Sequence, residues 1–196
     1  MKKFSIKEAI KFGWAKMKPN FLFFASVLTA ATVVSFVFGK EGFLLSAAGM
    51  IAQMFIGLGV VKNSLDIVDG KKFQYKSFYS EYKRFFDYFF GCIIYGLVVV
   101  AGLVLFIVPG IIFAIKYQFF PYFVVDKGFS ALKALEHSSK ITKGEKWDLF
   151  LFYLANIGIN IIGIFAFVVG MFATAPTTIL ASAHVYRKLE SHLRHN

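Results

Sequence analysis

The stretch VPGIIFAIKYQFFPYFVVD, residues 108–126, is apolar enough to enter a lipid bilayer, yet it contains a lysine and a proline. Lys116 lies near its middle, and Pro121 follows five residues later. A lysine at the centre of a membrane helix costs about 2.5–3.5 kcal/mol. A proline cannot donate to the carbonyl of the residue four positions before it. The stretch therefore predicts a short membrane helix with an interruption that neighbouring groups must accommodate.

The composition indicates a membrane protein. Of 196 residues, 58% are hydrophobic and 26 are phenylalanine, more than a soluble domain of this size buries. The net charge of +11 is compatible with nucleic-acid binding, but in a membrane protein it more often marks a basic cytoplasmic face. We expect anionic membrane lipid as a partner and no nucleic acid. Cys92 is the only cysteine and lies in an apolar run, so we expect no intrachain disulfide.

Six apolar runs predict an all-α integral membrane protein with six transmembrane helices. The runs occupy residues 21–38, 43–61, 88–108, 111–125, 149–168 and 171–186. A membrane helix needs about 20 residues, so the fourth and sixth runs are short. From Leu149 to Tyr186 there are 38 residues without a charge, enough for two helices and a tight turn.

The basic residues predict how these helices pair. They gather in residues 1–20, 62–87, 126–148 and 187–196. The positive-inside rule assigns such blocks to the cytoplasm, and we therefore expect both termini there. The chain is then one membrane domain with three hairpins, at residues 21–61, 88–125 and 149–186. Their outer turns are GKEG (39–42), VPG (108–110) and a segment near Gly170. We expect the segment 1–20 to be retained and not cleaved as a signal peptide.

An amphipathic segment precedes each hairpin. Ser5 and Glu8 form a capping box for the first segment, and Pro19 ends it. The apolar faces consist of Ile6, Ala9, Ile10, Gly13, Trp14 and Met17, then Phe78, Tyr82, Phe85, Phe86 and Phe89, then Ala131, Ala134, Leu135 and Ser138. We expect these helices to lie in the plane of the membrane interface on the cytoplasmic side. The recurrence of helix and hairpin suggests a threefold internal repeat.

The predicted spans contain few groups that carry chemistry. None of them contains a carboxylate, so a proton relay through a buried acid has no candidate. The four histidines lack cysteine or aspartate partners at ligand spacing, and we expect no metal and no cofactor. They are His137, His184, His192 and His195. The GLG sequence at residues 57–59 favours close helix packing, and so does the four-residue spacing of Ala173, Thr177 and Ala181.

Polar residues within the spans define the candidate site. Asn156 and Asn160 lie one helical turn apart, where they either form interhelical hydrogen bonds or line a polar cavity. Lys116 has three possible roles. It extends to nearby headgroups, it caps a carbonyl freed by Pro121, or it faces a cavity with Asn156 or Asn160 and binds an anion such as a lipid phosphate.

Residues 108–151 resemble a known family. The shared features are a Pro-Gly turn, a basic residue, a second proline and an Ala-rich amphipathic segment. They correspond to Pro109, Gly110, Ile111, Lys116, Pro121, Asp126, Ala134, Ser138, Thr142, Gly144, Trp147 and Phe150. The pattern resembles a superfamily of multi-pass bacterial and archaeal membrane proteins that includes the membrane domain of some glycerophosphoryl diester phosphodiesterases. The resemblance implies the membrane fold and a link to lipid metabolism. Phosphodiesterase activity in that family belongs to a separate soluble barrel, so no catalytic residue carries over.

We therefore expect a non-enzymatic protein of the bacterial cytoplasmic membrane that associates with lipid or docks a partner, which includes a second copy of itself. The alternative is a small transporter or permease component with a polar path. The ligand-binding candidates are Lys116, Gln118, Asn156 and Asn160. The structural candidates are Pro109, Gly110, Pro121, Gly144 and Trp147.

Overall fold

The computed structural model describes residues 4–39, 42–166 and 170–194, and these residues form helices and connections without a β-strand. The predicted all-α class is therefore confirmed for the described part of the chain. The helices are α1 (Ile6–Met17), η1 (Lys18–Asn20), α2 (Phe21–Phe38), α3 (Phe43–Val68), α4 (Ser77–Ser80), η2 (Glu81–Arg84), α5 (Phe85–Leu105), α6 (Ile107–Tyr117), α7 (Phe120–Lys127), α8 (Ala131–Ile141), α9 (Lys146–Phe165) and α10 (Met171–Arg194).

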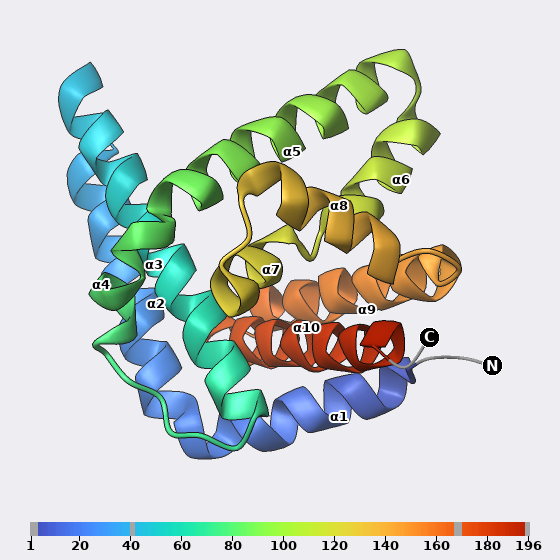
Figure 1. Ribbon diagram of the computed structural model, residues 1–196. Helices are drawn as coiled ribbons and strands as arrows, with labels where there is room; N and C mark the ends of the chain where they lie inside the picture. The colour runs from blue at the N-terminus through green and yellow to red at the C-terminus, as the bar shows by residue number, and fades with distance from the viewer. Residues whose placement is uncertain (1–3, 40–41, 167–169, 195–196) are drawn as a thin grey trace.

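In the described part of the chain, three pairs of consecutive helices pack against each other: α2 with α3, α5 with α6, and α9 with α10 (Figure 1). The first turn follows Phe38 and the third follows Phe165, where charge-free runs and glycines predicted them. Residues 40, 41 and 167–169 of these turns lie outside the described residues. Each pair is preceded by a short helical segment, namely α1, α4 with η2, or α8, in the order that the repeat predicted.

The predicted turn at residues 108–110 was wrong. Helix α5 ends at Leu105, Phe106 alone is extended, and α6 begins at Ile107. Pro109 belongs to the first turn of α6, where its missing N–H costs nothing because no helical partner exists for it. Gly110 is needed for packing, since a Cβ at this position would overlap the side chain of Leu103 on α5.

Helix α1 packs along α10 and uses much of its predicted apolar face for this contact. Ala9, Gly13 and Met17 are buried, and a Cβ at Gly13 would overlap the carbonyl of Thr177. Helix α8 likewise buries its apolar face against α5, α6 and α7. These faces therefore meet helices of the same chain, and their placement in a membrane interface stays a prediction.

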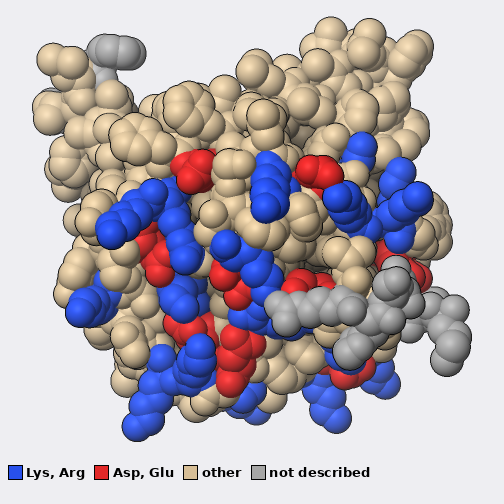
Figure 2. All heavy atoms as spheres, in the orientation of Figure 1, with Lys and Arg blue, Asp and Glu red and all other residues tan. Residues whose placement is uncertain are grey.

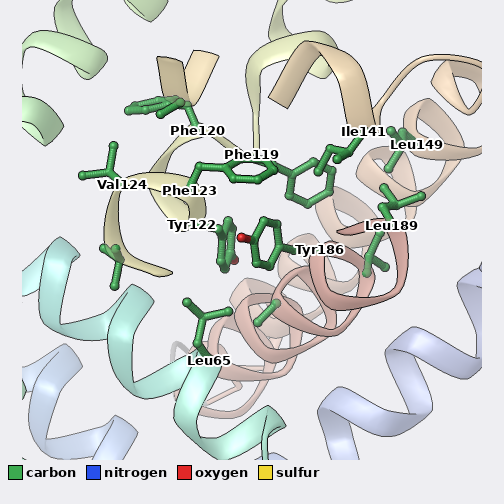
Figure 3. Packing of buried hydrophobic residues seen from close by; sticks show 14 of the residues in the cluster. Leu65, Phe119, Phe120, Tyr122, Phe123, Val124, Ile141, Leu149, Tyr186 and Leu189 are labelled. Carbon is green, nitrogen blue, oxygen red and sulfur yellow. The ribbon is translucent and has the colours of Figure 1, made fainter. Parts of the chain in front are cut away.

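The core lies where α7 and α10 meet (Figure 3). The ring of Tyr186 stacks on that of Tyr122 and meets Phe123 edge-on, with 5.1 Å between ring centroids in both pairs. The Tyr186 hydroxyl donates to Oδ2 of Asp126 at 3.0 Å. This aromatic contact joins the interrupted end of the middle helix pair to the last helix.

An ion-pair cluster ties together the charged ends of α3, α7 and α10. Arg187 donates to both carboxylate oxygens of Asp69, at 2.9 and 2.7 Å, and its Nη1 lies 2.8 Å from Oδ2 of Asp126. Partial burial opposes the charge of Arg187, but hydrogen bonds to Asp69 and the charge of Asp126 outweigh it and raise its pKa. Lys127 bridges Asp126 and Glu190 on the same side.

Within the described residues, five helical segments are long and apolar enough to cross a membrane. They are Ile6–Phe38, Leu44–Val68, Ser77–Leu105, Ile107–Lys127 and Lys146–Phe165. Helix α10 is not among them, since Pro176, neighbouring threonines and His184 make it more polar. Figure 2 shows charged side chains across the centre and lower part of one face, whereas the projecting upper ends are mostly uncharged. Several apolar helices indicate a membrane protein, while six crossings and the side of the termini stay predictions.

Candidate functional site

Helix α8 stabilises the interruption before Pro121. Ser138 is fully buried, and its hydroxyl donates to the carbonyl of Lys116 at 3.0 Å while it accepts from the Phe119 N–H at 3.1 Å. The Thr142 hydroxyl also approaches the Lys116 carbonyl, at 3.2 Å. Helix α6 ends at Tyr117 and α7 begins at Phe120, so the Lys116 carbonyl and the Phe119 N–H lie where the regular helix is interrupted, and side chains from α8 satisfy them.

Lys116 lines a cavity of about 400 Å³ between α5, the end of α6 and α8. We call it the Lys116 cavity, and its lining residues are Ile94, Tyr95, Val98, Lys116, Tyr117, Leu132, Leu135, Glu136 and Ser139. The ammonium lies 4.9 Å from the centre of the Tyr117 ring, within the range of a cation–π contact. Among the described residues, no carboxylate forms an ion pair with it.

Glu136 borders the same cavity but is already paired. Lys140 lies 2.6 Å from its Oε1 atom. The hydrogen bond from Lys140 is the main cause of a lowered pKa at Glu136, which therefore stays ionised at neutral pH. Because Glu136 and Lys140 balance each other, the charge of Lys116 is left uncompensated at the cavity.

A second cavity, of about 480 Å³, lies between the end of α6 and the α9–α10 pair. We call it the asparagine cavity. Its lining residues are Gln118, Phe119, Tyr122, Tyr153, Asn156, Ile157, Asn160, Ile161, Ile164, Thr178, Ile179 and Ser182. Asn160 donates from Nδ2 to the Asn156 carbonyl at 2.9 Å and to Oγ1 of Thr178 on α10 at 3.2 Å. The predicted interhelical hydrogen bond therefore exists, and the same amide also borders a cavity.

The structure brings together three of the four predicted ligand-binding residues. Gln118, Asn156 and Asn160 line the asparagine cavity, whereas Lys116 lines the other one. Lys116 and Gln118 are two residues apart, which turns their side chains by roughly 200° around a helix axis. Tyr95 and Ser139, which also line the Lys116 cavity, were not predicted from the sequence. A serine on the polar side of an amphipathic helix is common, and nothing local distinguishes this one.

The residues of the predicted structural motif have separate roles. Gly144 has φ +87° in the turn between α8 and α9, a conformation that favours glycine. Trp147 is 70% exposed and stacks on Phe150 at the start of α9. Gly57 and Gly59 confirm the packing interpretation, since a Cβ at either would crowd Tyr88 or Phe78.

The described residues contain no group of three or more potential metal-ligating side chains. His184 lies on α10, where Nε2 is 3.9 Å from Oε1 of Glu8 and its ring stacks on Phe12. His137 contacts the ring of Phe129. His195 lies outside the described residues.

The described residues thus form an all-helical protein with several apolar helices, and the Lys116 cavity and the asparagine cavity between them have apolar linings that include polar side chains. Residues 90–192 match the family described as "Protein of unknown function (DUF975)", and the chain belongs to this family. The match covers α6, α7 and α8, so the interruption at Pro121 and both cavities fall largely within it.

Relatives with curated sequences occur in mycobacteria. An uncharacterised protein of Mycobacterium bovis is 28% identical over 136 residues, which cover 69% of this chain and 42% of the relative. An uncharacterised protein of Mycobacterium tuberculosis strain H37Rv is 27% identical over the same share of both chains. The match thus spans less than half the length of these relatives. No solved structure matches the chain. These matches carry no information on the predicted kinship with phosphodiesterase membrane domains, which stays a prediction.

Proposed function

We propose that this protein is a non-catalytic membrane module that binds the anionic headgroup of a lipid at the Lys116 cavity. The observation that carries the proposal is an ammonium group without a carboxylate partner in a cavity between three helices. An anionic phosphate supplies the missing charge, and a charge-assisted hydrogen bond to it is about twice as strong as a neutral one.

The rest of the cavity suits an amphiphile. Ile94, Val98 and Leu132 provide apolar surface for an acyl chain, while the Ser139 hydroxyl has no side-chain hydrogen bond among the described residues and is available to a headgroup oxygen. Because this cavity opens between apolar helices, lipid is the first molecule that it would contact in a membrane. In this proposal the membrane is the bacterial cytoplasmic membrane, and the charged face in Figure 2 lies on its cytoplasmic side.

The test is to identify lipid that stays bound to the purified protein by native mass spectrometry. We expect Lys116→Met to lose most of the bound anionic lipid, and Lys116→Arg to retain it because the charge is kept. Lys133→Met is the matched control, since Lys133 lies on α8 outside the cavity and contacts the ring of Phe129.

Equal amounts of anionic lipid on the wild type and on Lys116→Met, with both variants folded by circular dichroism, contradict the proposal. Loss of lipid from Lys133→Met to the same extent also contradicts it, because the effect is then one of net charge and not of the cavity.

A small transporter is the second candidate. The polar lining of the asparagine cavity supports it, because a polar cavity among apolar helices is where transporters bind substrate. A path shared by Lys116, Asn156 and Asn160 is less favoured, since these residues line separate cavities. Substrate-dependent flux in proteoliposomes that Asn156→Leu abolishes is the result that this candidate predicts.

A further inference from the structure

The asparagine cavity contains hydrogen-bond acceptors without a partner, and the side-chain donors of Asn160, Gln118 and Ser182 are already engaged. Both N–H groups of Asn160 Nδ2 are used, on the Asn156 carbonyl and on Thr178, which leaves its Oδ1 as an acceptor. Gln118 donates from Nε2 to the Ile115 carbonyl at 3.0 Å, and Ser182 donates to the Thr178 carbonyl at 2.8 Å. The orientation of the Asn160 amide is thus fixed by its donors.

Asn156 is the most deeply buried amide of the cavity. It is 9% exposed, and its Oδ1 has no hydrogen-bond partner among the described residues, as is also true of Asn160 Oδ1. Asn63 on α3 provides the contrast. It is fully buried, but its Oδ1 accepts from the Gln74 N–H and its Nδ2 donates to two carbonyls. A buried amide is normally satisfied in this way, so the two acceptors on α9 point to a ligand that donates.

The lining also restricts the charge of that ligand. It contains no Lys, Arg, Asp or Glu, so nothing in it compensates an anion. Carbonyl-type oxygens attract N–H and O–H groups and favour a cation over an anion. The rings of Tyr122 and Tyr153 add surfaces that attract an ammonium group. Ile157, Ile161 and Ile164 extend this lining with apolar surface.

We propose that the asparagine cavity binds the donor-bearing end of an amphiphile, a primary ammonium or a hydroxyl group, with its hydrocarbon part against the isoleucines of α9. This site is distinct from the Lys116 cavity in position and in the charge it accepts. The inference stands independently of anionic lipid binding at Lys116.

The experiment compares four water-soluble probes that share a six-carbon chain: hexylamine, hexanol, hexyltrimethylammonium and hexanoate. Binding is measured from the rise in thermal unfolding midpoint with probe concentration, for the full chain in detergent. We expect hexylamine or hexanol to bind, and the comparison of the two decides between ammonium and hydroxyl. Hexyltrimethylammonium carries the same charge as hexylamine but has no N–H, and we expect it to bind at least about tenfold more weakly.

Variants test whether the probes bind in the asparagine cavity. Asn156→Leu should weaken binding of the preferred probe by about tenfold or more, the effect of losing one strong hydrogen bond. Asn156→Asp keeps the acceptor oxygens and should retain hexylamine binding. Gln53→Leu is the matched control, because Gln53 is a membrane amide that hydrogen-bonds between α2 and α3 away from the cavity.

Three results overturn the proposal: binding of hexyltrimethylammonium as tight as that of the preferred probe, tighter binding of hexanoate than of the other probes, or unchanged binding of the preferred probe to Asn156→Leu. The first two are measured on the wild type and do not depend on whether a variant folds. Lipid bound at Lys116 is monitored in parallel, so failure of one site is distinguished from failure of the other.

Discussion

Ser138 is the single side chain on which the interrupted middle helix depends most. Its hydroxyl satisfies the carbonyl of Lys116 and the N–H of Phe119 at once, and both groups lie where the chain leaves α6 and enters α7, just before Pro121. One interpretation of the sequence was that Lys116 caps a carbonyl freed by Pro121, whereas in the structure Ser138 satisfies the carbonyl of Lys116 itself. The sequence could not identify this partner, because the serine lies 22 residues later and belongs to another helix.

We expect Ser138→Ala to destabilise the protein by about 1–3 kcal/mol, the cost of leaving buried backbone groups unsatisfied. The neighbouring Ser139→Ala should change stability by less than about 0.5 kcal/mol, because its hydroxyl makes no side-chain hydrogen bond among the described residues. Thermal unfolding in detergent measures both. Equal stability of the two variants contradicts the role given to Ser138.

At the scale of helices, the close packing of α1 against α10 depends on the absence of a side chain at Gly13. Gly13→Ala places a methyl group against the Thr177 carbonyl and the Ala181 side chain. We expect a loss of about 1–3 kcal/mol, the usual cost of overpacking. The control is Gly96→Ala in α5, where an added Cβ meets no atom within 4 Å and helix propensity favours alanine by about 1 kcal/mol.

Unfolding monitored by tryptophan fluorescence distinguishes the two glycine variants, since Trp14 lies directly after Gly13. A Gly13→Ala variant as stable as the wild type would show that α1 does not dock on α10 as described. If Gly96→Ala destabilises the protein as much as Gly13→Ala does, the loss of stability comes from replacing a flexible glycine and not from close packing at Gly13.

The sequence predicted the long apolar helices, because long runs without charge mark them, while their arrangement as membrane hairpins stays a prediction. It was less able to place the short helices. An amphipathic face such as that of α1 has the same spacing whether it meets lipid or protein, and here Ala9 and Met17 meet α10. Pro109 suits an outer turn and a first helical turn equally, so the turn was assigned to it although Phe106 forms it.

The candidate site was predicted only in part for a geometric reason. Asn156 and Asn160 are four residues apart on one helix, so their shared face follows from spacing alone. Lys116 was grouped with them because all are polar residues in apolar runs. The turn of α6 and its break at Pro121 direct Lys116 toward α8 and Gln118 toward α9. Which cavity each side chain faces depends on tertiary packing, and the spacing of residues along the sequence does not reveal it.

For the whole molecule, the three-hairpin arrangement predicts that the charged helix ends lie on one side of the membrane and the turns that join each helix pair lie on the other. The cluster of Asp69, Asp126 and Arg187 gathers the charged ends of α3, α7 and α10. Phe106, in the turn between α5 and α6, is 74% exposed. In a membrane, these two regions should face opposite sides.

Cysteine labelling in a Cys92→Ala background measures this most directly. Single cysteines at Phe106 and Gly42 should react with an impermeant maleimide added to intact cells. Cysteines at Lys72 and Lys143 should react only after permeabilisation, because they belong to the basic segments assigned to the cytoplasm. Labelling at position 143 from outside, or protection of position 106 until permeabilisation, contradicts the three-hairpin membrane arrangement.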